Sequence, residues 1–175
     1  GYEKAGRVMK RWHVIYTRLR SESLALQHLE RQGFTAYLPR HRKQRRHARR
    51  ADWITAPLFP RYMFVLIDVA AARWRSIRST IGVSDIICQG DRPLPIMPGV
   101  VEEIIERENE EGLVCAAPNL NLRKGDKVRV ERDSLCDQVG LFETMADKDR
   151  VIILLNLLGR QVRALVPAKD VYACI

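Results

Sequence analysis

The sequence lacks the features that would mark a membrane protein, a metalloprotein or an enzyme. No apolar run approaches the roughly 20 residues needed to span a bilayer, and the N-terminus has no apolar core of a signal peptide. The cysteines form no CxxC pair and have no histidines at metal-ligand spacing. They are Cys88, Cys115, Cys136 and Cys174. No paired acidic cluster, Gly-rich phosphate loop or recognisable Ser/His/Asp arrangement is present. We therefore expect a cytoplasmic protein without a metal, a cofactor, enzymatic activity or a membrane partner.

Acidic residues are also scarce in the first hundred positions, where positive charge dominates. Residues 1–100 carry 19 Lys/Arg against 7 Asp/Glu, residues 101–122 carry 1 against 6, and residues 123–175 carry 10 against 8. Such a positive field favours polyanions through counterion release. Its densest part is Arg40–Arg50, with seven Lys/Arg in eleven residues. We interpret this stretch as a solvated hairpin tip that contacts phosphates, because it is too charged to pack and too long for a tight turn.

The first domain is predicted to be α+β, with helices over an antiparallel sheet. Trp12–Thr17 alternates aromatic and β-branched residues as a strand does, and Ser21 caps a helix that ends near Gly33. The nearly continuous apolar run Tyr62–Ile67 predicts a central strand. The other expected elements are a strand at Thr35–Leu38, a helix at Ala70–Ser79, a strand at Gly82–Cys88 and a helix from Pro98 to Glu111.

Apolar periodicity disappears between Gly112 and Leu122, which is typical of a flexible linker. We therefore expect a domain at residues 11–111, a linker at 112–122 and a second domain at 123–175. Short alternating segments in the second domain predict four or five strands of a small β-barrel, which closes its own edges. The segments are Lys127–Glu131, Val139–Thr144, Arg150–Leu155 and Gln161–Val166.

The second domain also carries a helical period. Val151, Ile153 and Leu155 share one face of a strand, but a helix would form a continuous apolar stripe of Val151, Leu154, Leu155, Leu158, Val162 and Leu165. Gly159 would cost about 1 kcal/mol inside a helix, and the β-branched Val-Ile-Ile run prefers strands. We therefore predict a barrel for the isolated domain, with a helical hairpin as the alternative in the intact protein.

Several stretches together resemble the NusG superfamily of transcription factors. In the first domain they are Trp12–Tyr16, Pro57–Val65 and Thr80–Val83, and in the second, which resembles a KOW module, Lys124–Val130 and Leu154–Arg160. The order and spacing of these motifs make the joint signal strong, and it covers nearly the whole chain from Trp12. His28–Gln32 and Leu154–Leu157 resemble the specialised RfaH-like members more than general NusG.

The resemblance implies an NGN-like first domain that binds bacterial RNA polymerase and suppresses pausing or termination. The KOW domain would recruit a small-subunit ribosomal protein or a termination factor. In RfaH-like proteins the second domain can also leave the barrel for a helical hairpin that covers the polymerase-docking patch. Such a rearrangement would be autoinhibition by a shift of populations.

The resemblance also places polar side chains against the exposed non-template DNA strand. They map onto His28, Arg31 and Gln32 of the first helix, with Arg18 and Thr80 nearby. Arg and Gln can hydrogen-bond base edges, and Arg also binds phosphates. Ile81 stands where RfaH carries an arginine, so we expect a different sequence preference or none. The basic stretch adds phosphate contacts at Arg42, Lys43, Arg45 and Arg46. The alternative for both sets is an ordinary solvated surface.

For polymerase docking, the resemblance selects Tyr62 and Phe64, which share one face of their strand. Val101 and Ile104 would complete the apolar patch. Ordinary sheet and helix core is the alternative for this patch, and Tyr62, with its polar tip, is the better interface candidate. A second contact, to the opposite lobe of the polymerase, falls at Arg73 and Arg75, on either side of a tryptophan that we expect in the core.

Two other functions are the alternatives. A ribosome-associated RNA-binding KOW protein would explain the second domain but not the Pro57–Val65 block. An enzyme acting on nucleic acid would need acidic or nucleophilic groups that the sequence does not show. A pull-down that recovers core RNA polymerase rather than ribosomal subunits separates the two leading hypotheses.

Overall fold

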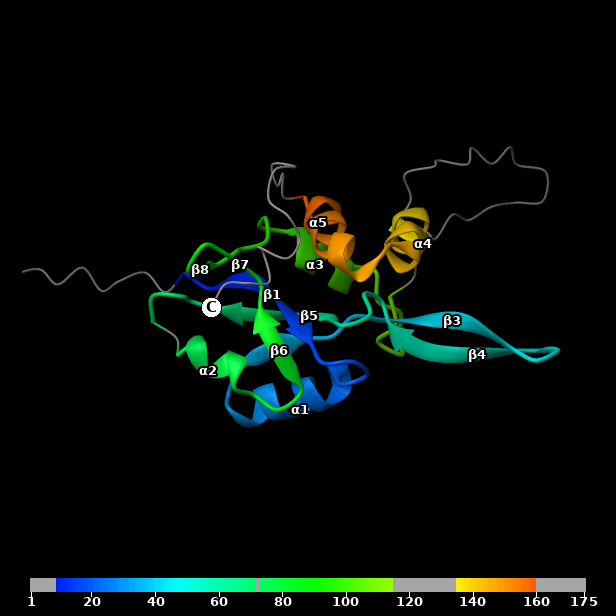
Figure 1. The fold of residues 1–175 in the computed structure, drawn as a ribbon, viewed down its shortest axis with the longest axis horizontal. Coiled ribbons are helices and arrows are strands. Elements are labelled where there is room, and N and C mark those ends of the chain that lie inside the picture. The colour runs from blue at the N-terminus through cyan, green and yellow to red at the C-terminus, as the bar shows by residue number, and fades with distance from the viewer. Residues whose placement is uncertain (1–8, 72, 115–134, 160–175) are drawn as a thin grey trace, which may run out of the picture.

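The computed structural model describes residues 9–71, 73–114 and 135–159, and Figure 1 shows its elements. The central sheet has the strand order β2-β5-β1-β6, and every neighbouring pair is antiparallel. The predicted central strand is therefore confirmed, because β5 lies between β2 and β1. The strands are β1 (Arg11–Thr17), β2 (Thr35–Tyr37), β5 (Tyr62–Ile67) and β6 (Val83–Ile86).

Both faces of the sheet are covered, and alternation along β5 decides which side chain faces which layer. Met63 and Val65 belong to the buried cluster beneath α1 (Glu22–Arg31) and α2 (Arg75–Arg78). Tyr62 and Phe64 belong to the opposite cluster, beneath α3 (Val100–Glu106) and two further helices. Figure 1 shows α1 and α2 below the sheet and the other three helices above it. The α+β prediction with an antiparallel sheet is confirmed for this domain.

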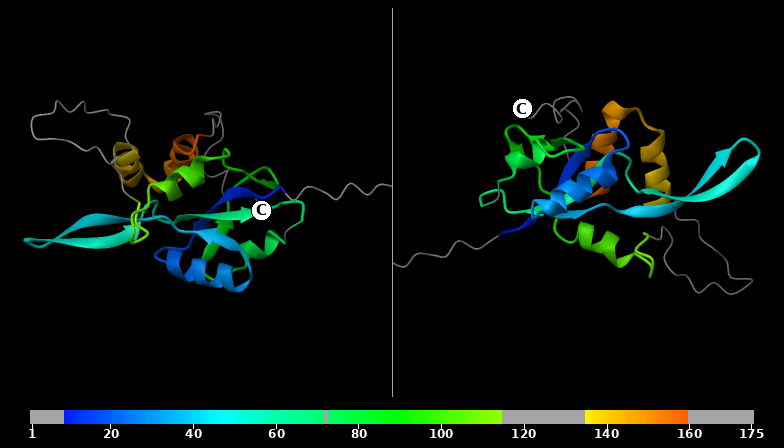
Figure 2. Two further views of the ribbon diagram at one scale, coloured as in Figure 1. Left: turned by 180° about the vertical axis from the view of Figure 1, so that it is seen from behind. Right: turned by 90° about the horizontal axis from the view of Figure 1, so that it is seen from below.

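The basic stretch is a pair of strands rather than a long loop. β3 (Arg40–His47) pairs in register with β4 (Arg50–Pro57), and the turn needs only Ala48 and Arg49 between them. The prediction of a solvated tip from Arg40 to Arg50 is wrong in this respect. Charged residues can occupy a strand when both faces of a two-stranded ribbon are open to water. The ribbon, which we call the basic arm, projects beyond the sheet in the views of Figures 1 and 2.

Three other predicted elements are shorter than expected. The helix predicted at Ala70–Ser79 is reduced to the single turn of α2, in which Ile77 is buried. The strand predicted at Gly82–Cys88 divides into β6 and β7 (Cys88–Gln89), and β7 pairs with β8 (Arg92–Pro93). The helix predicted from Pro98 to Glu111 is reduced to α3, which ends at Glu106.

The described part of the predicted second domain is helical. α4 (Leu135–Thr144) and α5 (Asp147–Leu157) occupy the positions predicted as strands Val139–Thr144 and Arg150–Leu155. The barrel prediction is therefore wrong for these segments in the intact chain, and the helical hairpin named as the alternative is present. The predicted strands Lys127–Glu131 and Gln161–Val166 lie outside the described residues, as does most of the predicted linker.

Burial explains why the helical period prevails here. Val151, Leu154, Leu155 and Leu158 recur at helical spacing, and all four are buried against the sheet. Fully burying an aliphatic side chain contributes about 1.5–3 kcal/mol, which exceeds the weak preference of β-branched residues for strands. Gly159 does not interrupt the helix, because it follows the C-cap Leu158 with a φ of +77° and so ends α5. None of the described helices is long and apolar enough to cross a membrane.

Candidate functional site

An apolar surface on the upper face of the sheet combines side chains of β5, α3 and the loop before β5. It consists of Phe59, Tyr62, Phe64, Val101 and Ile104, all of them buried in one cluster. Phe59 and Phe64 meet edge to face with ring centroids 6.2 Å apart. The structure thus brings together Tyr62, Phe64, Val101 and Ile104, the four residues that the sequence assigns to the apolar polymerase-docking patch.

Two hydrogen bonds fix α3 and the residues just after it to the sheet independently of α4 and α5. The indole Nε1 of Trp12 donates to Glu102 Oε1 over 3.1 Å, and the hydroxyl of Tyr37 donates to Glu108 Oε1 over 2.7 Å. Burial and the Glu108 carboxylate both raise the pKa of Tyr37, so this phenol stays protonated and keeps donating. The part of the apolar surface that α3 supplies is therefore held by contacts within the first domain.

α4 and α5 cover the apolar surface. Phe142 of α4 lies edge-on to Phe59 and Tyr62, with ring centroids 5.6 and 5.7 Å apart. Tyr62 is left only 1% exposed. Sequence reasoning favoured Tyr62 as an exposed interface residue, and this conformation instead buries it. A partner could reach Tyr62 only if α4 and α5 moved away.

A polar contact between β3 and α4 lies at the edge of this cover. Lys43 Nζ is 3.0 Å from Glu143 Oε2, and both side chains are partly exposed. Arg150 of α5 donates from Nε to the Met145 carbonyl over 3.0 Å and from Nη2 to the Glu143 carbonyl over 3.1 Å. These contacts join α4 to α5 and join α4 to the basic arm. Lys43, which the sequence analysis predicts to contact phosphate, therefore pairs with the Glu143 carboxylate in this structure.

His41 lies beside the same carboxylate, with Nε2 3.9 Å from Glu143 Oε1. Burial lowers the pKa of His41; the Glu143 carboxylate acts in the opposite direction, and Lys43 adds to the lowering. The imidazole is therefore neutral at pH 7, and the charge pair at this edge is the one between Lys43 and Glu143.

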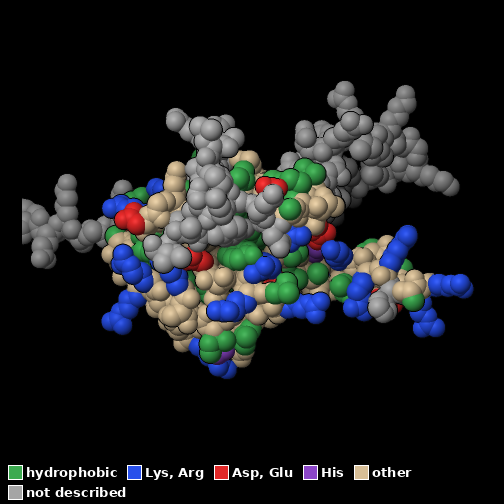
Figure 3. Space-filling model, viewed as in Figure 1, with side chains coloured by type: hydrophobic (Ala, Val, Ile, Leu, Met, Phe, Trp, Pro, Cys, Tyr) green, Lys and Arg blue, Asp and Glu red, His purple; other side chains and the backbone are tan. Residues whose placement is uncertain are grey.

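The basic arm presents its charges on two faces, since residues opposite each other in an antiparallel pair point to the same side. Arg42 and Arg46 pair with Thr55 and Ala51, so they lie on one face. Lys43 and Arg45 pair with Ile54 and Asp52 on the other. Figure 3 shows the blue side chains standing out along this arm. The four predicted phosphate-binding residues are thus close in sequence but divided between two faces.

The predicted DNA-facing residues of the first helix gather beside the turn before β6. Gln32 Nε2 donates to Thr80 Oγ1 over 2.8 Å and to the His28 carbonyl over 3.2 Å. Thr80 is buried and donates to the Ser76 carbonyl over 3.0 Å, so its hydroxyl is occupied inside the protein. Arg18 and Arg31 are exposed and His28 is half-buried. Gln32 is exposed as well, so the surface open to a ligand consists of these four side chains, whereas Thr80 is buried.

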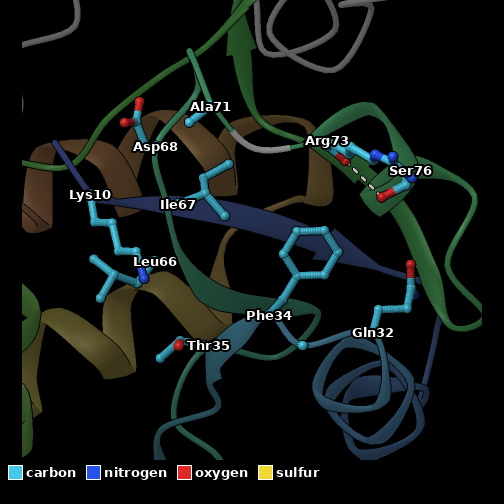
Figure 4. Close-up of a pocket in the computed structure, with 11 residues that line it drawn as sticks. Lys10, Gln32, Phe34, Thr35, Leu66, Ile67, Asp68, Ala71, Arg73 and Ser76 are labelled. Atoms are coloured by element: carbon cyan, nitrogen blue, oxygen red, sulfur yellow. Dashed lines mark hydrogen bonds between the residues drawn. The ribbon is translucent and has the colours of Figure 1, made fainter. Parts of the chain in front are cut away.

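The two arginines predicted to contact the opposite polymerase lobe line separate cavities. Arg73 lines a cavity of about 590 Å³, together with Gln32, Phe34 and Ser76. In Figure 4 the Phe34 ring and the Gln32 side chain point into this space, and Ser76 Oγ donates to the Arg73 carbonyl. Arg75 lies over the ring of Trp74, 4.8 Å from its centroid, and lines another cavity of about 570 Å³. Trp74 is buried, as expected.

Sequence reasoning missed three residues that the structure makes prominent. Phe142 and Glu143 contact residues about 80 and 100 positions earlier, and nothing local in the sequence signals such contacts. Trp53 is 62% exposed in the middle of β4 and could have been found only after the basic stretch was read as a strand. No group of three or more potential metal ligands occurs among the described residues.

Comparison with known proteins gives matches over most of the chain. The family described as "Transcription termination factor nusG" matches residues 10–105. The transcription termination/antitermination protein NusG of Staphylococcus carnosus is 25% identical over 165 residues, which cover 87% of this chain and 89% of that protein. The same protein of Staphylococcus aureus strain Mu50 gives the same identity and coverage. A solved structure described as "Domain interaction in Thermotoga maritima NusG" covers 67% of this chain and 70% of its own, with 19% identity and a TM-score of 0.42.

Proposed function

Because the chain belongs to the NusG family, we propose that it is a bacterial transcription elongation and antitermination factor that binds RNA polymerase in the cytoplasm. Members of this family are transcription factors, and the chain is not an enzyme. The proposed contact is the apolar surface around Tyr62 and Phe64. One observation carries the proposal: aromatic and aliphatic side chains of β5 and α3 form a single apolar face, which another part of the same chain covers.

The position of α4 and α5 over the apolar surface is the proposed means by which polymerase binding is regulated. α4 and α5 occupy the surface that the polymerase would need, so the intact chain would bind only after they leave. This arrangement resembles the specialised RfaH-like members, and we propose that the chain is one of them. A partner that binds only the uncovered state shifts the population toward it, at the cost of the free energy that α4 and α5 gain by packing.

The remaining contacts complete the proposal. Arg18, His28, Arg31 and Gln32 would face the non-template DNA strand, and the basic arm would contact phosphates. Arg73 and Arg75, both exposed, would meet the opposite lobe of the polymerase. Residues 123–175, once released, would form a KOW barrel that recruits a small-subunit ribosomal protein or a termination factor. The supporting observation is that this segment has both a helical and a strand periodicity. The helices account for the first but not for the second.

A pair of α5 substitutions tests both the partner and the cover. Leu154 is fully buried, so Leu154→Asp places an unpaired charge in the covered interface, which destabilises it by several kcal/mol. Asn156→Asp adds the same charge to the exposed side of the same helix and is the matched control. Affinity for purified core RNA polymerase is measured for both variants and for the unsubstituted chain. We expect tighter binding for Leu154→Asp alone and loss of that gain when Tyr62→Ala is added.

The outcomes separate the two parts of the proposal. Equal polymerase affinity of all three chains would refute the proposal that α4 and α5 block binding, but RNA polymerase would remain the partner. No polymerase binding by any chain, with ribosomal subunits recovered from a lysate instead, would favour the ribosome-associated alternative.

A further inference from the structure

The face of the basic arm that points away from α4 carries an exposed tryptophan. Trp53 of β4 lies opposite Gln44 of β3, so it shares a face with Arg42 and Arg46, two positions away on either side of Gln44. The indole is 62% exposed, and the guanidinium of Arg42 lies 5.6 Å from the centre of its ring. We call this surface the Trp53 face.

The neighbours of Trp53 leave its ring accessible. Ala51 and Thr55 are the adjacent residues of β4 on the same face, and both are small. They lie opposite Arg46 and Arg42, whose long side chains end in charged groups. A flat aromatic ring therefore stands between two short side chains, with the Arg42 guanidinium over one side of the ring and Arg46 opposite Ala51. This geometry leaves space for a planar group beside the indole.

The charge of the Trp53 face differs from that of the opposite face. Asp52 lies opposite Arg45 on the far side, and Lys43 is paired there with Glu143 at 3.0 Å. The Trp53 face has no carboxylate among the residues of β3 and β4. Its positive charge is therefore available to an anionic ligand, whereas part of the charge on the other face is already neutralised.

We infer that the Trp53 face binds single-stranded DNA, with an unpaired base stacked on the indole and the neighbouring phosphates contacted by Arg42 and Arg46. Stacking on an exposed aromatic is available to an unpaired base but not to the interior of a duplex, where both faces of each base are already covered. A basic groove with an aromatic platform binds single strands with little sequence preference. This inference rests on the proposed function, which brings the chain to a transcription bubble, and adds a DNA contact at a second element.

The site does not require α4 and α5 to move. Glu143 contacts the face of β3 that carries His41 and Lys43, which is opposite to the Trp53 face. The full chain should therefore bind single strands in the covered state and without polymerase. This independence lets the inference be tested separately from the docking of the polymerase.

The experiment measures binding of the full chain to a fluorescent oligothymidylate of about 12 nucleotides, within the range of site sizes known for small single-strand-binding domains. A duplex and an oligouridylate of the same length are measured beside it. Trp53→Leu keeps an apolar side chain but removes the stacking ring, and Trp53→Phe keeps a ring. Arg42→Gln and Arg45→Gln remove one charge each from the same strand, on opposite faces.

We expect Trp53→Leu to weaken binding of the oligothymidylate by about 5- to 100-fold, as the loss of one stacked base does, with little change in salt dependence. Trp53→Phe should retain most of the affinity. Arg42→Gln should weaken binding more than Arg45→Gln, and the duplex should bind the unsubstituted chain more weakly than the single strand.

Three results would overturn the inference. Equal binding by Trp53→Leu and the unsubstituted chain would mean that Trp53 packs against Arg42 and does not stack on a base. Equal losses in Arg42→Gln and Arg45→Gln would indicate a diffuse positive field without a preferred face. Tighter binding of oligouridylate than of oligothymidylate would assign the face to RNA. Because these measurements contain no polymerase, none of these results bears on the proposed polymerase contact, and a failure of that contact would leave them unchanged.

Discussion

Phe142 is the side chain through which α4 meets the apolar surface, and its truncation tests the cover directly. Its ring is fully buried, with centroids 5.6 Å from Phe59 and 5.7 Å from Tyr62. Truncating a buried phenylalanine to alanine costs about 3–5 kcal/mol, and in Phe142→Ala this cost falls on the covered state. Since each 1.4 kcal/mol is about tenfold, the ratio of covered to uncovered chains should fall by about two to three and a half powers of ten.

Hydrogen exchange of backbone amides measures this ratio residue by residue. Amides of α5 such as those of Leu154 and Leu155 exchange when the helices leave the surface, whereas amides of β1 and β5 report on the sheet. We expect Phe142→Ala to accelerate exchange in α5 while the sheet stays protected. Leu141→Ala is the matched control, because the neighbouring side chain on α4 is 57% exposed and its loss should change stability by less than about 0.5 kcal/mol.

Two results would refute this reasoning. If Phe142→Ala and Leu141→Ala exchange alike, the Phe142 ring does not hold the cover. If α5, β1 and β5 all accelerate by the same factor in Phe142→Ala, the helices and the sheet open as one cooperative core, and no separate uncovered state is reached before global unfolding.

Three further predictions concern single contacts. Glu143→Lys should weaken the cover, and adding Lys43→Glu should recover about 0.2–1 kcal/mol, measured by a double-mutant cycle on α5 exchange; no recovery would show that the ion pair contributes nothing. Burial lowers the pKa of His41 below the value of 6.5 of an exposed histidine, so on acidification the state without α4 and α5 on the apolar surface binds a proton more readily than the covered state. The packing of α4 and α5 should therefore weaken as the pH falls below about 6.5. His41→Gln should flatten this pH dependence, and an unchanged pH profile would exclude His41 as its source. Gly82→Ala should lower the thermal midpoint more than Gly33→Ala. Both glycines have a positive φ, +87° at Gly82 and +88° at Gly33, but only at Gly82 would the new Cβ lie 2.8 Å from a backbone nitrogen of α1. Equal shifts of the midpoint would mean that α1 moves to make room for the Cβ.

The first domain was largely predictable because its periodicities are local. Tyr62–Ile67 is apolar on both faces and lies in the sheet centre, and Ser21 and Gly33 bracket α1 as expected. Ser21 nevertheless makes no capping hydrogen bond, since its Oγ donates to the Leu19 carbonyl. At the basic arm the dense charge predicted a solvated tip, but a two-stranded ribbon has no buried face to protect, so charged residues can form its strands.

The second domain shows the limit of reading one segment at a time. The run from Val151 to Leu158 fits a strand and a helix, and a choice between them depends on which surface the segment packs against. That surface is built from Phe59, Tyr62 and Phe64, about ninety positions earlier. Local preferences of Gly159 and the Val-Ile-Ile run pointed to a barrel because they contain no information on this distant partner. Prediction of the site had the same limit. The resemblance identified Tyr62 and Phe64, but it did not predict that α4 and α5 bury them.

The hydrogen bond at Val114 sets how far the covering helices can travel. Its amide donates to the Arg40 carbonyl over 2.7 Å, so the first domain holds the chain just before residues 115–134, which lead to α4. Even fully extended, that segment spans at most about 70 Å. One pair of helices confined to a sphere of that radius has a local concentration of about 1 mM or more. A separate copy of α4 and α5 added in trans would therefore compete for the apolar surface only at millimolar levels. In the proposed mechanism, re-covering after a bound partner departs would be an intramolecular event whose rate is independent of protein concentration.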